Sequence, residues 1–123
     1  MNRTELLNEA LHNLQRSSSD IEACTVFSED GLVIASSLPP DMDEDHVAAM
    51  TSAMLSMGGR TADELKRGKL EQLFVKGDNG YAIVMHAGTY SALVAITRKD
   101  AKLGLIFLDM NRAVKTIAEI LAS

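Results

Sequence analysis

Residues 80–97 read GYAIVMHAGTYSALVAIT, and this stretch decides the fold. Two short apolar runs, 81–87 and 91–97, are joined through Gly88 and Thr89. So short a connection predicts that the two strands are antiparallel neighbours. Along each run, apolar side chains fall on both alternations, so each strand has two apolar faces. Strands of this kind need cover on both faces, which predicts a sheet with helices on each side.

Three further strand candidates lie outside this pair. Residues 21–28 and 32–36 are apolar runs joined through Asp30-Gly31, which is a hairpin signal. Residues 70–76 connect to the central pair through a short turn at 78–80. The sequence therefore predicts five strands, all antiparallel.

Three segments have helical periodicity instead. The first begins near Thr4, its expected N-cap, and the last runs from about 102 to 121. The longest runs from 43 to about 67, with acids at its start and the basic pair Lys66-Arg67 at its end. That charge order complements the helix dipole. The predicted fold is α/β (α+β), a single domain over residues 1–123 with the order α-β-β-α-β-β-β-α and a five-stranded antiparallel sheet covered on both faces.

The middle helix is apolar over an unusually wide arc. At about 100° per residue, its apolar positions span about 180°, whereas one buried face needs roughly 100°. Either the sheet and loops cover all of it, or one flank contacts a second subunit. We favour the second interpretation, because flexible methionines fill irregular interfaces well. The helical positions alone leave open which flank faces the sheet: the one with Met50 and Met57, or the one with Ala48, Leu55 and Ala62.

The composition excludes several classes of function. The 123 residues carry a net charge of −5, which argues against nucleic acid and against an anionic membrane surface. Aromatic residues make up 4%, so the core must be aliphatic. A single cysteine, no spanning apolar run and acids in the first turns predict a cytoplasmic protein without membrane insertion.

The sequence offers little for catalysis or metal binding. His12, His46 and His86 have no metal-ligand spacing, and Cys24 lies in a strand, where a buried thiol is inert. The run 66–69 lacks the pattern of a phosphate-binding loop. We therefore expect no enzyme activity, no catalytic residue, no cofactor and no metal site.

Four stretches, taken together, resemble the roadblock (dynein light chain) family, including its MglB-like branch. They are the hairpin IEACTVFSEDGLVIAS at 21–36, the helix segment AAMTSAML at 48–55, the paired strands within 80–95, and LGLIFLDM at 103–110. The resemblance covers nearly the whole chain. It implies a roadblock/profilin-like fold.

The resemblance also implies a homodimer. In that family the long helices pair, and the strand after each helix joins its mate and extends the sheet across both subunits. In this chain that strand is 70–76, which at a sheet edge would otherwise risk promiscuous pairing. The candidate dimer-interface residues are Val47, Met50, Met54, Met57, Thr61, Leu70, Gln72 and Phe74.

Relatives in the family are associated with small Ras-like GTPases, as activators or scaffolds, and others are adaptors. The resemblance thus implies a GTPase regulator or scaffold, with Arg60, Lys66 and Arg67 as candidate partner contacts. The MglB-like branch is associated with repositioning its GTPase rather than with an inserted arginine, so no arginine is assigned a catalytic role. The alternative is a structural adaptor in a sensor or motor complex without effect on GTP turnover. A small-molecule sensor is disfavoured by the scarcity of aromatic and convergent polar residues.

Overall fold

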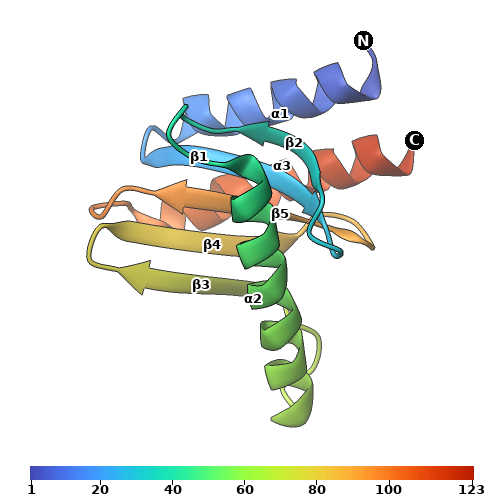
Figure 1. Ribbon diagram of the computed structural model, residues 1–123, viewed down its shortest axis with the longest axis vertical. Coiled ribbons are helices and arrows are strands. Elements are labelled where there is room, and N and C mark those ends of the chain that lie inside the picture. Colours follow the sequence, from blue (N-terminus) through green and yellow to red (C-terminus); the bar gives the residue numbers. More distant parts are fainter.

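The computed structural model describes residues 1–123 as three helices and one five-stranded sheet (Figure 1). The strands are antiparallel throughout and lie in the order β2-β1-β5-β4-β3. The predicted order of elements and the antiparallel sheet are confirmed. The elements are α1 (Arg3–Ser17), β1 (Ile21–Ser28), β2 (Val33–Ser37), α2 (Glu44–Glu64), β3 (Gln72–Gly77), β4 (Gly80–His86), β5 (Ser91–Thr97) and α3 (Leu103–Ala122).

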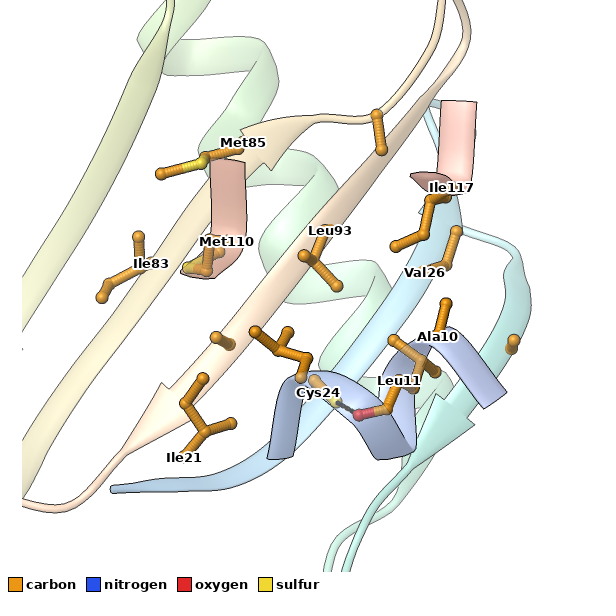
Figure 2. Close-up of a cluster of buried hydrophobic side chains, with 14 of the residues drawn as sticks. Ala10, Leu11, Ile21, Cys24, Val26, Ile83, Met85, Leu93, Met110 and Ile117 are labelled. Carbon is orange, nitrogen blue, oxygen red and sulfur yellow. Dashed lines mark hydrogen bonds between the residues drawn. The ribbon is translucent and has the colours of Figure 1, made fainter. Parts of the chain in front are cut away.

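Helices cover both faces of the sheet, as the two-faced strands predict. The larger core lies under α1 and α3, where Figure 2 shows Leu11, Cys24, Ile83, Leu93 and Met110 gathered from both helices and three strands. A smaller core lies under α2 on the other face. Its buried members are Phe27, Ala48, Leu55, Val84, Ala92 and Val94. The central strand β5 is therefore buried from both sides.

The expected N-cap of the first helix is wrong by two residues. Asn2 is the cap, and its Oδ1 accepts a hydrogen bond from the backbone N–H of Glu5 at 2.8 Å. Asn caps a helix at least as well as Thr, because its side-chain oxygen reaches the same unpaired N–H groups. Thr4 lies inside the first turn instead.

The end of α2 also differs from the prediction. The helix stops at Glu64, and Lys66 takes a left-handed conformation with φ 57°. The N–H of Lys66 bonds the carbonyl of Asp63, and that of Arg67 bonds the carbonyl of Ala62 at 2.7 Å, which is a Schellman motif. The last turn of α2 therefore contains no basic residue, and the predicted end near residue 67 is wrong by three residues. A basic residue still lies at the carboxyl end of the helix, because the Nε–H of Arg67 donates a hydrogen bond to the carbonyl of Leu65 at 3.0 Å.

The β3–β4 turn depends on one glycine. Gly80 has φ 144°, and a Cβ built on it would lie 1.9 Å from the carbonyl oxygen of Thr97. No side chain fits in that space. Gly80 thus allows β4 to leave the turn in close contact with the end of β5.

Candidate interaction surface

Helix α2 packs one flank on the sheet and leaves most of the other exposed, although Val47 and Met54 still contact the core. Ala48, Thr51 and Leu55 are its buried residues. Small side chains at 48 and 51 let the helix approach β1 closely, and Leu55 packs with Val84 and Val94 below it. The flank with Ala48 and Leu55 therefore packs on the sheet. Helical positions alone did not decide between the two flanks.

The opposite flank of α2 carries the methionines. Met50 is 58% exposed and Met57 is 61% exposed, while Val47 and Met54 are only partly covered. Thr61, one turn further on, is also exposed. Together, Val47, Met50, Met54, Met57 and Thr61 form one apolar flank, which we call the methionine flank.

The C-terminal turns of α2 project beyond the sheet (Figure 1). At Gly58 the helix is still close to its neighbours, since an added Cβ would lie 2.9 Å from Leu73 Cδ2 and 3.2 Å from Leu70 Cδ2. At Gly59 an added Cβ would meet nothing within 4 Å. Leu65 at the end of this overhang is 64% exposed. A single copy of the chain thus leaves apolar helix surface uncovered past β3.

Strand β3 forms one edge of the sheet, and its side chains divide between the two faces. Leu73 lies opposite Val84, which belongs to the core under α2, and Phe74 lies opposite Ile83, which belongs to the core under α1 and α3. The ring of Phe74 lies 6.1 Å from that of Phe107 in α3. Neighbouring residues of this edge therefore contribute to different surfaces.

The predicted interface residues fall into two groups. The methionine flank is continuous, and Leu70 lies close beneath it at Gly58. Gln72 and Phe74 lie on the opposite face of the sheet and meet that flank only through the edge of β3. Two exposed apolar residues, Leu65 and Val75, were not among the predicted interface residues. The signals that point to them are the helical line that Leu65 shares with Val47 and the alternation of Val75 with Phe74.

The predicted partner contacts also separate. Arg60 lies at a polar groove of about 490 Å³ on the other side of α2, and its guanidinium is 3.9 Å from the carboxylate of Glu64. Lys66 and Arg67 lie at the exposed tip of the overhang. The groove is lined by Glu29, Asp30, Ser52, Leu55, Ser56, Gly59, Arg60 and His86.

The single cysteine of the chain lies apart from this surface. Cys24 is buried, its thiol points at the carbonyl oxygen of Leu11 at 3.9 Å, and burial raises its pKa to about 12 (Figure 2). A thiol held protonated in this way is a poor nucleophile. No three His, Cys, Asp or Glu side chains lie close enough together to hold a metal ion. None of the three helices has the length and apolar character needed to cross a membrane.

Comparison with known proteins identifies the family. Residues 7–97 match the Roadblock/LC7 domain. The chain is 41% identical over 97 residues to the uncharacterized protein MJ1340 of Methanocaldococcus jannaschii, covering 79% of this chain and 84% of that protein. The fold is similar to a Roadblock/LC7 domain from Streptomyces avermitilis, with a TM-score of 0.87, 25% identity and coverage of 94% and 97%. It is also similar to the gliding protein MglB of Thermus thermophilus, with a TM-score of 0.85, 20% identity and coverage of 96% and 90%. The chain belongs to the Roadblock/LC7 domain family.

Proposed function

We propose that this chain forms a homodimer in the cytoplasm and that the dimer regulates or scaffolds a small Ras-like GTPase through protein contact. One observation supports the proposed dimer most strongly. The exposed Met57 next to Gly58, the overhang of α2 and the open edge of β3 lie together at one end of the sheet. An exposed apolar patch and an unpaired strand edge are both liabilities for a lone protein. A partner that covers them together removes both.

A second copy of the chain has the right shape for this role. In a two-fold dimer each surface meets its own equivalent, so β3 pairs with β3 and α2 with α2. Antiparallel pairing of β3 extends the sheet to the mate. The overhang of each α2 then lies over the sheet of the other subunit, where Leu65 and Met57 lose contact with water.

The GTPase part of the proposal is supported by the family and by the fold shared with MglB. The exposed side chains of α2 also support it, because apolar residues on one flank and polar or charged residues on the other can both contact another protein. The polar flank of α2, with Arg60 at its groove, and the basic tip at Lys66 and Arg67 stay free in this dimer. These are the candidate contacts for the GTPase.

The first experiment measures mass by light scattering at micromolar concentration. A dimer is expected, and a monomer would contradict the proposal. Met54→Asp, on the methionine flank, should yield a folded monomer, because it places an unpaired charge in the interface. Circular dichroism checks the fold of this variant, since Met54 also packs at the border of the core of its own subunit. Ser56→Asp, an exposed position on the polar flank of the same helix, is the matched control and should stay dimeric.

The second experiment mixes the dimer with a Ras-like GTPase encoded beside its gene and follows co-elution and GTP turnover. A complex with altered turnover is expected for a regulator. A complex with unchanged turnover would instead identify a structural adaptor. The absence of any complex with such GTPases would overturn the GTPase proposal and leave the dimer standing.

A further inference from the structure

The free edge of β3 presents the backbone groups of every second residue. The backbone N–H of Tyr81 donates to Thr97 Oγ1 at 3.2 Å, so at this position the backbone of β4 faces β5. Tyr81 lies opposite Lys76 in the sheet. Because the residues of such a pair turn their N–H and C=O groups away from one another, those of Lys76 point to the free edge. The same alternation turns the backbone groups of Gln72 and Phe74 to that edge.

A second copy of β3 can pair with this edge only in certain registers. Directly opposed residues of antiparallel strands have their side chains on the same face of the sheet. A two-fold axis normal to the sheet must therefore pass beside one residue of β3 and not between two. The residues near the middle of the strand are Leu73, Phe74 and Val75. Each of them defines one possible register.

The register centred on Phe74 pairs every outward-facing backbone group of the strand. Phe74 then lies opposite its own equivalent, and Gln72 lies opposite Lys76 of the mate. All three residues belong to β3, so each of them exchanges hydrogen bonds with a partner that is also in extended conformation.

The other two registers pair fewer of these groups. With Leu73 at the axis, Lys76 lies opposite Leu70, which precedes the strand. With Val75 at the axis, Gln72 lies opposite Asp78, which belongs to the turn between β3 and β4. In both cases one outward-facing residue of each strand has no strand residue to bond.

Side chains also favour the register centred on Phe74. On the face of α2, it places Val75, which is 51% exposed, opposite the apolar Leu73 of the mate. On the other face, it brings together the two rings of Phe74, which is 46% exposed in one subunit. Each ring already lies 6.1 Å from Phe107 and 6.2 Å from Tyr81. Aromatic pairs across neighbouring strands stabilise a sheet.

The charges along the edge are compatible with this register. The exposed acids Glu71 and Asp78 lie opposite Gly77 and Leu70 of the mate. The one cation of the strand, Lys76, lies opposite a neutral glutamine. No two like charges are directly opposed, which would destabilise the pairing.

We propose that two copies of this chain join their sheets with Phe74 of each β3 at the two-fold axis. This inference rests on the homodimer proposed above and names the residues that select a second copy as the partner of this edge. It makes positions 72 and 76 of opposite subunits direct neighbours, which charge substitutions and cross-linking can test.

Charge at position 72 tests the register by the sign of its effect. Gln72→Glu meets Lys76 of the mate twice by symmetry and should lower the dimer dissociation constant about threefold. Gln72→Lys should raise it by about the same factor. Added salt should weaken both effects, because the charges are exposed. Analytical ultracentrifugation measures the constants, and Ser56→Glu and Ser56→Lys on the polar flank of α2 are matched controls without effect.

The competing registers give different results in the same experiment. A register centred on Val75 places Asp78 opposite position 72, so Gln72→Lys would tighten the dimer and Gln72→Glu would weaken it. A register centred on Leu73 places Phe74 opposite position 72, and neither substitution would have a marked effect. Either result overturns the proposed register.

Cysteine cross-linking gives an independent measure. Opposed residues of a hydrogen-bonded pair have Cα atoms about 5.5 Å apart, which a disulfide can span. Under mild oxidation, Phe74→Cys should link to its own equivalent, whereas Leu73→Cys and Val75→Cys should link to each other when coexpressed and not to themselves. The wild-type chain is the control and should stay unlinked, because Cys24 is buried.

The outcomes separate this proposal from the homodimer itself. A dimer in which Leu73→Cys or Val75→Cys links to itself faster than Phe74→Cys overturns the register and leaves the homodimer standing. A dimer without any cross-link in β3 and without a charge effect at position 72 overturns it as well, because its interface lies elsewhere. A wild-type chain that light scattering shows to be a monomer contradicts the homodimer.

Discussion

Strands β5 and β3 both carry a run of three or more consecutive aliphatic or aromatic residues, but their surroundings are opposite. Both are short runs rich in aliphatic or aromatic side chains, SALVAIT and QLFVKG. Strand β5 has a neighbour on each edge and a helix on each face, and nearly all of it is buried. Strand β3 has one neighbour, and most of it is exposed. The same kind of sequence therefore builds the core in one place and, by our proposal, an interface in the other.

The largest expected effect comes from a matched pair of valines. Val94 in β5 is fully buried and Val75 in β3 is 51% exposed, and both face α2. Val94→Ala should lower the free energy of unfolding by about 2–3 kcal/mol, because it removes buried methyl groups and leaves a cavity. Val75→Ala should cost about 1 kcal/mol or less. Urea denaturation measures both, and equal losses would contradict the contrast between the two strands.

The second prediction tests the covered half of the sheet through Cys24 in β1. Burial raises the pKa of this thiol from 9.0 to about 12, so the folded chain keeps its proton where the unfolded chain loses it. The resulting stabilisation is complete below pH 9 and is lost as the pH rises from 9 toward 12. The loss should be about 1.4 kcal/mol per pH unit.

The measurement compares unfolding of the wild-type chain and of Cys24→Ala at several pH values up to about 10.5. The wild-type chain should lose stability more steeply above pH 9 than the variant. Parallel curves would show that the thiol is accessible to water. In that case the core under α1 would be looser than the structure implies.

The third prediction concerns two adjacent exposed residues of α2. Met57→Asp, on the methionine flank, should raise the dimer dissociation constant at least tenfold, or about 1.4 kcal/mol. Ser56→Asp should change it much less, since Ser56 faces the polar groove. Analytical ultracentrifugation measures both constants. Equal effects would mean that the methionine flank has no special part in assembly.

The smallest expected effect is at the pair of helix glycines. Gly59→Ala should stabilise the chain by about 0.5–1 kcal/mol, because its Cβ enters open space and alanine favours the helix. Gly58→Ala should gain less or lose, because its Cβ meets the methyl groups of Leu73 and Leu70. Thermal unfolding of the two variants and the wild-type chain, measured side by side, gives the change in stability for each. A larger gain at Gly58 would contradict the close approach of α2 to β3.

The order of elements follows from the sequence because alternation and helical spacing are local properties. The two-faced strand β5 and the turn before Gly80 are both visible in the residues themselves. Helix ends are harder to predict from the sequence, since they depend on competition between nearby capping groups. Asn2 displaces Thr4 as the cap, and the left-handed Lys66 ends α2 short of the predicted end near residue 67.

The surface was harder to predict than the fold. Both flanks of α2 are apolar, so the wheel could not decide between Met50 and Leu55; the decision depends on how closely each side chain lets the helix approach the sheet. The division of Leu73 and Phe74 between two faces depends on the register with β4. Register is a property of the pair of strands, and neither strand encodes it alone.

The overhang of α2 has a consequence for the lifetime of the protein. Its tip, residues 66–69, reads KRGK, and all four residues are exposed, so it offers cleavage sites to proteases that cut after basic residues. If the homodimer forms as proposed, the mate holds the apolar turns of α2 that precede this tip, so the tip keeps its side chains in solvent but unfolds less readily into the active site of a protease. Unassembled chains would then be degraded first, and the amount of protein in the cell would follow the amount that has found a mate.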